Sequence, residues 1–401
     1  MNQTDITPLV KVYHRRLATT SLHFKRHLYH QINWNARLIG IKGARGVGKT
    51  TLLLQYIKEH FPHVDDTLWV SLDNLWFKTH DVDELVEWLY THGQTVLFFD
   101  EVHKCPDWTL RLKNYYDNYP DLRIVYTGSS MLEIDHSKVD LSRRQSLYTL
   151  PVMSFCEYLE FEGAISTPVL TLSDLLTNHV GVSMDICGRV KILKLFSDYL
   201  DHGQYPFYKE ADQEFHTRLS SMSNLVIETD MPAVTEVTYA TIEKTKKLLM
   251  IVSDHVPFVP NISRLCESLS TTRDMCLKML YALDRADILS LLTRELKSYK
   301  HLTSPEKIYL ANTNLMAALG SNADIGNLRE TFFVSQVQHT ASVQMPNKGD
   351  FLLEGKYLIE VGGAAKTFDQ IKDEPHSYLA VDDIETGYGA RIPLWMFGLL
   401  Y

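Results

Sequence analysis

Cysteine is scarce in the 401-residue sequence, and its five cysteines are scattered without a CxxC pair. This spacing favours reduced thiols in a cytosolic protein over a disulfide framework or a zinc site. No stretch approaches the roughly 18 uncharged apolar residues that a membrane-spanning helix needs. Segment 1–20 lacks the apolar region of a signal peptide, so we expect a cytoplasmic protein without a membrane segment.

An excess of positive charge is also absent. The formal net charge of −9 argues against indiscriminate binding to nucleic acid or to an anionic membrane, although a local basic face is not excluded. A basic cluster does lie near the N-terminus: Lys11, Arg15, Arg16, Lys25 and Arg26. We interpret it as the solvated face of a helix in residues 1–35, with a nucleic-acid contact as the alternative.

Apolar periodicity divides the rest of the chain, whose length favours two or three domains. Residues 36–165 alternate apolar runs with helical patterns, which predicts an α/β domain with a parallel sheet. Its expected strands are 37–42, 67–72, 95–99, 122–126 and 146–150, with helices at 50–60 and about 82–90. Residues 166–250 are predicted to form a helical lid or linker.

Two further units are expected after residue 250. Residues 251–311 give two helices joined by a short turn and then a strand pair (288–293 and 307–310), which suggests a winged helix-turn-helix. Arg273, Lys278 and Arg285 on its second helix are candidate phosphate contacts, but a packing role is equally open. Residues 312–401 are predicted to contain a helix, two strands (350–353 and 357–361), a second helix and a last strand.

The octet at 43–50, GARGVGKT, fits the phosphate-binding pattern G-x-x-x-x-G-K-[ST] between a predicted strand and a predicted helix. Glycines let backbone N–H groups approach phosphates closely, and the helix N-terminus adds partial positive charge. Lys49 would reach the β- and γ-phosphates, and Thr50 would bind magnesium. The predicted nucleotide-binding residues are Gly43, Ala44, Arg45, Gly46, Val47, Gly48, Lys49, Thr50 and Thr51.

Two carboxylates end the apolar strand that follows, and they make the octet more specific. Asp100 is the predicted magnesium partner, and Glu101 is predicted to orient and deprotonate the attacking water. Ser129 is the candidate γ-phosphate sensor, with an ordinary glycine turn as the alternative. Arg143 or Arg144 is a candidate arginine finger, acting in cis or in trans, or both are surface arginines. No guanine-reading Asn-Lys-x-Asp motif is present, which favours ATP.

These motifs resemble a family of prokaryotic AAA-type ATPases. The resemblance rests on RLIGIKGARGVGKTTLLL (37–54), LFFDEVHKCPDW (97–108) and the segment 126–159. It implies a P-loop core of the glutamate-using (ASCE) branch, followed by a winged helix and a small C-terminal α/β domain with a restriction-endonuclease-like (PD-(D/E)XK-like) core. His103 and Lys104, just after Glu101, are interpreted as loop residues.

An endonuclease-like core needs acids that converge on a metal and a lysine that faces the attacked phosphate. Asp350 and Glu360 lie at suitable positions, with Glu330 as a third acid. Gly362 stands where the lysine belongs, and Lys366 would have to replace it from the predicted helix. The domain is therefore an active nuclease, a degenerate fold used for binding, or another α/β domain.

The sequence thus predicts an ATP- and Mg²⁺-dependent switch that acts on DNA or on a protein partner, in a monomer or a homo-oligomer. An ATP-regulated DNA nuclease and a nucleotide-locked scaffold with little turnover are the alternatives.

Overall fold

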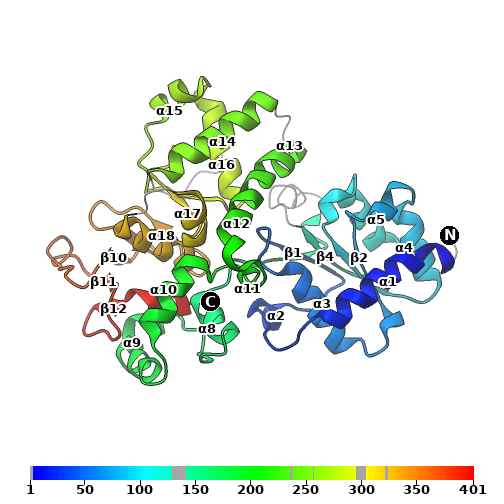
Figure 1. Ribbon diagram of the computed structural model, residues 1–401, viewed down its shortest axis with the longest axis horizontal. Helices are drawn as coiled ribbons and strands as arrows, with labels where there is room; N and C mark the ends of the chain where they lie inside the picture. Colours follow the sequence, from blue (N-terminus) through cyan, green and yellow to red (C-terminus); the bar gives the residue numbers. More distant parts are fainter. Residues whose placement is uncertain (1–2, 129–140, 235–237, 256, 295–303, 321–323) are drawn as a thin grey trace. The chain divides into compact units, whose positions relative to one another are not determined.

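The computed structural model describes residues 3–128, 141–234, 238–255, 257–294, 304–320 and 324–401. The chain divides into two compact units, Met1–Val152 and Met153–Tyr401 (Figure 1). The sequence placed the end of the first domain at residue 165. Helix α8 (Phe155–Phe161) instead belongs to the second unit, because it packs against α10 (Ile192–His202) and the C-terminal turn η6 (Leu394–Leu399).

A five-stranded parallel sheet forms the centre of the first unit. Its strands are β1 (Leu38–Lys42), β2 (Leu68–Ser71), β3 (Val96–Asp100), β4 (Arg123–Gly128) and β5 (Ser146–Thr149), in the order β2-β3-β4-β1-β5. Every residue of β1 and β3 is buried. Continuous apolar runs are typical of parallel strands that are covered on both faces, which is why β1 and β3 could be predicted, whereas β5 (SLYT) is only partly buried.

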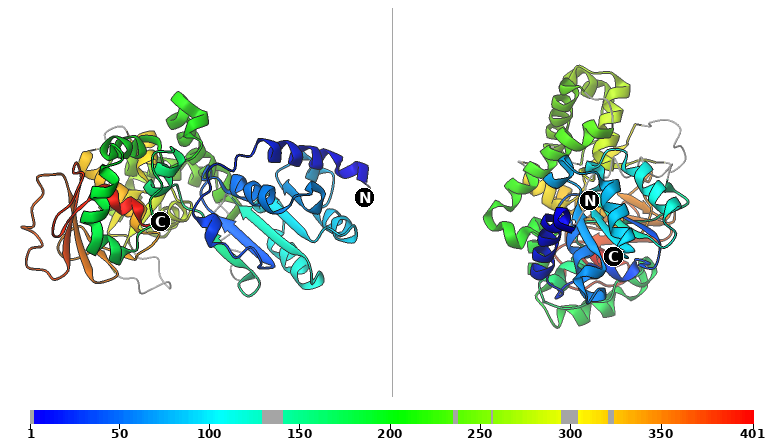
Figure 2. Two further views of the ribbon diagram at one scale, coloured as in Figure 1. Left: turned by 90° about the horizontal axis from the view of Figure 1, so that it is seen from below. Right: turned by 90° about the vertical axis from the view of Figure 1, so that its right-hand side faces the viewer.

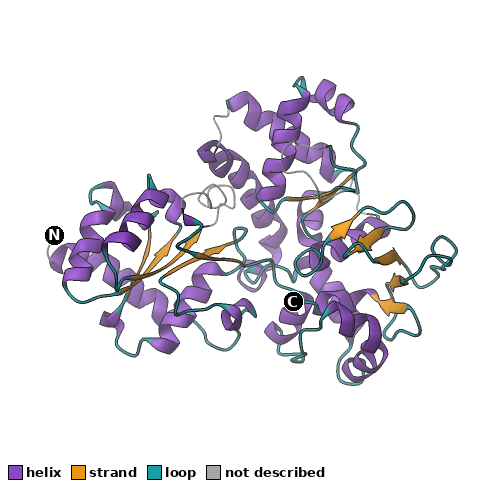
Figure 3. Cartoon of the chain, turned by 180° about the vertical axis from the view of Figure 1, so that it is seen from behind, coloured by secondary structure: helices purple, strands orange, loops and turns teal. Residues whose placement is uncertain are grey.

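The helices of this unit are α1 (Gln3–Thr19), α2 (Leu28–Gln31), α3 (Lys49–His60), α4 (Val82–Thr91) and α5 (Trp108–Asn118), with short 3-10 turns η1 (Val64–Asp66), η2 (Leu75–Lys78) and η3 (Val102–Lys104). The chain crosses the sheet one way from β1 to β2 and returns through β3 to β4. Right-handed crossovers therefore place α3 on one face and α4 and α5 on the other. Figure 3 shows helices on both faces of this sheet.

Helix α1 packs against α3 and β2, and Figure 2 shows it as the dark blue helix at the N-terminal end of the chain. Its apolar residues Ile6, Leu9, Tyr13 and Leu17 recur at helical spacing and are buried. The basic residues Lys11, Arg15 and Arg16 are exposed on the helix, as the solvated-face interpretation predicts. The other two members of the basic cluster lie after the helix and differ from these: Lys25 is partly buried and pairs with Glu59, and Arg26 is buried.

The second unit begins with helices, as predicted for residues 166–250. They are α8, α9 (Leu172–Cys187), α10, α11 (Tyr208–Ala211), α12 (Phe215–Leu225) and α13 (Met231–Val234), with a 3-10 turn η4 (Asp212–Glu214) and a π-helical turn η5 (Val226–Asp230). Capping boxes at Ser154 and Thr171 start α8 and α9, because each side chain accepts the backbone N–H three residues on. None of the helices in the described ranges has both the length and the apolar character needed to span a bilayer.

Three helices and a strand pair follow: α14 (Tyr239–Ser253), α15 (Ile262–Leu269), α16 (Arg273–Arg285), β6 (Leu289–Leu292) and β7 (Lys307–Leu310). The strands are antiparallel, and Phe258 adds a bridge to Ile308. The helical spacing of Met275, Met279 and Leu283 in the sequence predicts core positions on α16; Met279 and Leu283 are buried, whereas Met275 is only partly buried. The predicted order of helix, turn, helix and strand pair is therefore present.

The C-terminal part contains α17 (Thr313–Leu319), α18 (Ile325–Val337) and a sheet with the order β12-β11-β10-β9-β8. Its strands are β8 (Val343–Gln344), β9 (Phe351–Leu353), β10 (Tyr357–Gly362), β11 (Ser377–Val381) and β12 (Arg391–Pro393). β10 pairs in parallel with β11 and antiparallel with β9, and α18 packs on β10.

The helix predicted after residue 361 is not formed, and that prediction was wrong. Residues 363–376 make successive turns, in which the N–H groups of Lys366, Ile371 and Glu374 each bond to the carbonyl three residues earlier. Adjacent glycines and Pro375 in this segment disfavour helix. The side chain of Ile371 is nevertheless buried in the apolar core beside the sheet.

Candidate functional site

The phosphate-binding octet connects the end of β1 to the first residue of α3, at the edge where the parallel strands end. Gly46 and Gly48 have φ angles of 81° and 98°, which only glycine adopts without strain. A Cβ atom on Gly43 would lie 2.2 Å from the carbonyl oxygen of Leu150. All three glycines of the octet are thus required by backbone geometry, and the loop can approach a phosphate closely.

Lys49 opens α3 and is buried, with its ammonium group directed back into the loop. Nζ donates to the carbonyl oxygens of Gly43 and Ala44 at 2.8 and 2.7 Å. The lysine thus lies across the loop that would surround the phosphates. Phosphate oxygens are stronger acceptors for an ammonium group than neutral carbonyls are, so they would compete for it.

Asp100, at the end of β3, joins two other elements of the site. Its Oδ2 accepts from the Thr50 hydroxyl at 2.6 Å, and its Oδ1 accepts from the Thr127 hydroxyl on β4. Burial raises the pKa of the Asp100 carboxyl, while the hydrogen bonds from Thr127 and Thr50 oppose the rise. A cation beside this carboxylate would favour its charged form.

The oxygen atoms of Thr50 and Asp100 are suited to a magnesium ion. Hard cations prefer oxygen ligands, and Mg²⁺ usually takes one or two carboxylates together with phosphate oxygens and waters. Within the ranges that the structure describes, no group of three His, Cys, Asp or Glu side chains is placed to hold a metal. An ion at Asp100 would therefore depend on the hydroxyl of Thr50 and on a bound phosphate.

Glu101 follows β3 in a left-handed conformation, with a φ angle of 54°. Its backbone N–H donates to the Thr127 hydroxyl oxygen at 3.3 Å, so Thr127 contacts both acidic residues. Its carboxylate Oε2 lies 3.3 Å from Nε2 of His103, whose side chain is only 1% exposed. His103 lies on the short turn after β3, as its interpretation as a loop residue predicts, but its ring is buried against Glu101, which the sequence did not predict.

The predicted sensor and the two candidate arginine fingers differ in what the structure shows of them. Ser129, the predicted sensor, lies outside the described residues, whereas Thr127, two positions earlier on β4, contacts Asp100. Arg144 forms a two-pronged ion pair with Asp117 of α5, at 2.9 and 3.0 Å. Arg143 is exposed, so it remains the stronger candidate for an arginine finger, which stays a prediction.

Arg26 donates hydrogen bonds to the phosphate-binding loop, a role that the sequence did not predict. Its guanidinium donates to the carbonyl oxygen of Val47 at 2.6 Å and to that of Pro151 at 2.8 Å. It therefore ties the middle of the loop to the segment after β5. Nothing in the sequence distinguishes Arg26 from the exposed basic residues near it.

The comparisons with known proteins agree with this geometry. Residues 35–159 match a family described as "AAA domain". An uncharacterized protein of Methanocaldococcus jannaschii, MJ1637, is 27% identical over 377 residues, which cover 84% of this chain and 78% of that protein. The family match and the parallel sheet support an AAA-type P-loop domain in this part of the chain.

Solved structures with similar parts share little sequence with this chain. A DnaA of Aquifex aeolicus bound to AMPPCP is 13% identical, with a TM-score of 0.25, covering 71% of this chain and 89% of DnaA. A katanin structure that addresses self-assembly is 17% identical with a TM-score of 0.26, covering 42% of this chain and 60% of katanin. Scores this low support no inference about function.

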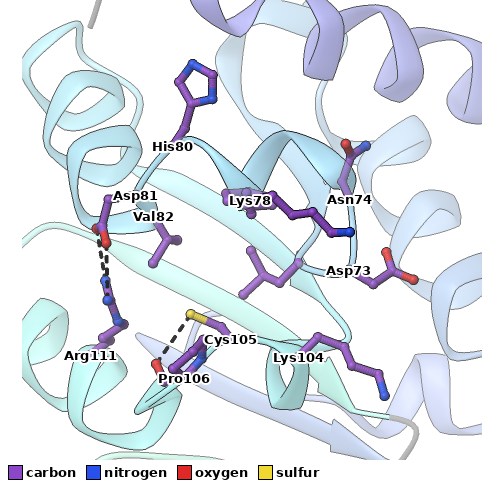
Figure 4. Close-up of a pocket in the computed structure, with 12 residues that line it drawn as sticks. Asp73, Asn74, Lys78, His80, Asp81, Val82, Lys104, Cys105, Pro106 and Arg111 are labelled. Atoms are coloured by element: carbon purple, nitrogen blue, oxygen red, sulfur yellow. Dashed lines mark hydrogen bonds and ion pairs between the residues drawn. The ribbon is translucent and has the colours of Figure 1, made fainter.

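A cavity of about 430 Å³ in the AAA domain lies beside the segment that follows Glu101 (Figure 4). Lys104, Cys105 and Pro106 line it together with residues of η2 and the start of α4. Arg111 bonds to Asp81 at this cavity and holds the pKa of the Asp81 carboxyl below its ordinary value. His103 is thus followed directly by residues that line the cavity.

The C-terminal acids are near one another but are already engaged. Glu330 accepts from Lys307 at 2.5 Å and from the Tyr309 hydroxyl at 2.6 Å. Glu360, which is 1% exposed, lies 2.6 Å from Nζ of Lys366. Asp350 accepts the N–H of Val361, and burial raises its pKa to about 6, with the charges of Glu330 and Glu360 adding to the rise.

The Lys366 side chain occupies the space beside Gly362 that a side chain at position 362 would fill. A Cβ atom on Gly362 would lie 2.7 Å from the Cγ and Cδ atoms of Lys366. The aliphatic part of the lysine therefore lies over the glycine, and its ammonium reaches Glu360 from a turn rather than from the predicted helix. The site retains its acids and a lysine, but within the described residues they do not form a three-ligand metal group.

One of the three candidate phosphate contacts of α16 is engaged in an ion pair. Lys278 pairs with Asp274 at 2.8 Å, while Arg273 and Arg285 are exposed. On the neighbouring helix α14, Lys244 and Lys247 donate to the carbonyl oxygens of Ser270 and Ser268, near the end of α15. Much of the positive charge of this region therefore stabilises the region itself.

Proposed function

We propose that the AAA domain binds ATP with Mg²⁺ and hydrolyses it. The observation that carries the proposal is the hydrogen-bonded group of Thr50, Asp100 and Thr127, because it joins the phosphate loop to the ends of β3 and β4. A buried carboxylate that accepts hydrogen bonds from two hydroxyl groups would gain from a metal cation beside it. The left-handed glycines of the octet and the family match of residues 35–159 add support.

Each residue has one role in this reaction. Lys49 would leave the loop carbonyls and neutralise the β- and γ-phosphates, and Thr50 with Asp100 would hold the magnesium ion. The metal would supply charge neutralisation on the transferred phosphoryl group. Glu101 would accept a proton from the attacking water, which must lie within hydrogen-bonding distance of its carboxylate.

Substitution of Lys49 tests this proposal. Lys49→Ala should abolish the binding of a fluorescent ATP analogue and the release of phosphate, because the cation that faces the phosphates is lost. The matched control is Lys58→Ala at the other end of α3, where Lys58 is exposed and donates to the carbonyl of Thr20. Phosphate release at the parent rate by purified Lys49→Ala would refute the assigned site.

The hydrolysis would drive a switch in which residues 251–311 act as a winged helix and the C-terminal sheet is a binding domain with an endonuclease-like core. The engaged charges around α16 favour packing or a protein partner over a DNA contact. DNA remains the alternative partner, and homo-oligomerisation would let Arg143 act on a neighbouring subunit.

A nuclease is the second candidate function, and one observation favours it: Lys366 reaches Glu360 across Gly362, so an acid and a lysine remain together. The test is incubation of plasmid DNA with the full chain, ATP and either Mg²⁺ or Mn²⁺. Cleavage that disappears in both Asp350→Ala and Glu360→Ala would establish it. The absence of cleavage under every condition would leave a binding domain.

A further inference from the structure

We propose that His103 is a positioning residue for Glu101: the buried imidazole fixes the carboxylate in the orientation that general-base catalysis requires. The inference rests on the proposed ATPase function and assigns to it a residue outside the phosphate-binding octet and the acidic pair. The inference depends on the histidine at position 103 being buried next to Glu101.

The first observation is the burial of the imidazole. The side chain of His103 is 1% exposed, although it lies on the short turn η3, where the next residue, Lys104, is exposed. A polar ring on a surface turn would normally remain in water. Here the turn directs it inward, and Nε2 lies 3.3 Å from Oε2 of Glu101.

The second observation is that Glu101 is held from two different elements. The N–H of Glu101 bonds to Thr127 of β4, and Glu101 itself has a left-handed conformation directly after β3. That conformation costs a non-glycine residue about 1 kcal/mol or more, so it persists only where neighbouring contacts stabilise it. The backbone is therefore fixed by Thr127, and the carboxylate is next to His103.

The chemistry explains why this matters. A glutamate side chain has several rotatable bonds, and a general base acts only when its oxygen is within hydrogen-bonding distance of the attacking water. A ring N–H that faces one carboxylate oxygen restricts these rotations and leaves the other oxygen for the water. The Glu101 side chain is still 20% exposed, so it remains accessible from the site.

Two substitutions of His103 separate positioning from packing. His103→Phe fills the space of the ring but removes the N–H donor, so kcat should fall on the order of 10- to 100-fold, as when an orienting partner in an active site is removed. His103→Gln places an amide N–H near the position of Nε2, so most of kcat should be restored. The dissociation constant for AMPPCP with Mg²⁺ should be unchanged in both variants, because neither touches the phosphate loop.

The matched control is His60→Phe at the end of α3. His60 also lies beside a glutamate, with Nδ1 3.9 Å from Oε2 of Glu59, but this pair is exposed. Phenylalanine preserves the stacking of the ring on Tyr56, so kcat should stay at the parent value.

A double substitution tests whether His103 acts through Glu101. In the Glu101→Gln background, His103→Phe should cause no further loss of single-turnover rate, because the oriented group is already absent. Independent, multiplicative losses would overturn the proposal, and so would a His103→Phe variant with the parent kcat. Equal damage to kcat and to AMPPCP binding in both His103 variants would show a structural role instead. A parent protein without turnover, indistinguishable from Lys49→Ala, would refute the ATPase function itself before any His103 variant is compared.

Discussion

Two regions of the chain contain a buried acidic residue on a strand together with a nearby lysine, and they differ in what faces the acid. In the AAA domain, Asp100 accepts hydrogen bonds from two neutral hydroxyl groups, and Lys49 donates to loop carbonyls. In the C-terminal sheet, Glu360 is next to the ammonium group of Lys366. The first carboxylate is hydrogen-bonded by neutral hydroxyl groups, with the charge of Lys49 acting on it from the loop, whereas the second is in direct contact with a lysine ammonium group.

This difference indicates which region is prepared for a ligand. A carboxylate that is held by hydroxyl groups keeps its negative charge available to a metal ion, and burial makes the unneutralised charge costly. A carboxylate that is paired with a lysine has already been neutralised, so a metal would have to displace the lysine. The AAA domain is thus the region where ligand binding should change the internal contacts most.

The largest expected effect is on catalysis in the AAA domain. Glu101→Gln should lower kcat by roughly 10²- to 10⁴-fold, because the amide cannot accept the proton of the attacking water. Binding of Mg²⁺–ATP should remain, measured by equilibrium binding of a fluorescent analogue. Glu84→Gln, at an exposed position of α4, should change neither quantity. A nucleotide-locked scaffold would show similar, slow turnover in the parent and in Glu101→Gln.

The next effect is on stability in the C-terminal sheet. Lys366→Met should lower the local free energy of opening by about 2–3 kcal/mol, because the buried Glu360 charge loses its partner. Hydrogen exchange at the amides of β10 and β11 measures this change. Lys348→Met removes an exposed lysine that lies 2.8 Å from Glu374 and should change the protection much less, because exposed ion pairs contribute little to stability. Equal protection in both variants would mean that Lys366 does not stabilise Glu360.

A smaller effect should separate backbone strain from ligand binding within the AAA domain. Gly48→Ala forces alanine into a φ angle of 98° and should weaken ATP binding by about tenfold, since left-handed backbone costs roughly 1–2 kcal/mol. Gly93→Ala imposes similar strain at a φ angle of 89°, in open space after α4. It should lower the melting temperature by a few degrees without changing the affinity for ATP. Equal affinities in the two variants would contradict the role of the loop.

The AAA domain and the C-terminal sheet also differ in how much of their structure the sequence predicted. The central strands of the AAA domain were predicted because buried parallel strands such as β1 and β3 are apolar runs. The pairing of Asp100 with Thr127 was not, because it depends on β3 and β4 being neighbours, which the sequence does not state. His103 was missed for a related reason: the direction of its ring depends on the left-handed turn at Glu101.

The C-terminal sheet was harder to predict. A helix was expected after β10, but local signals oppose it: Gly362 and Gly363 stand at its start, and Thr367 bonds to Asp369 within the segment. Strands β8 and β12 are too short to leave a periodic pattern. Lys366 was named as a substitute lysine, yet its path over Gly362 could be found only from the folded turn.

The smallest effect concerns Asp284 of α16, a third kind of carboxylate that accepts the N–H of Leu291 at 2.9 Å. Burial raises its pKa to about 7, while the bond from Leu291 opposes the rise. The folded protein therefore holds a proton that the unfolded chain has already lost between pH 4 and pH 7, so stability falls as the pH rises through this range. Asp284→Asn should remove part of this loss, so it should raise the melting temperature more at pH 8 than at pH 5. The stabilisation at pH 8 should exceed that at pH 5 by about 1 kcal/mol, because the side chain is only partly shielded from water. Asp254→Asn, at the exposed end of α14, should show no such difference. A gain for Asp284→Asn that is the same at both pH values would mean that its carboxyl titrates normally and that its environment resembles water more than the interior around Asp100.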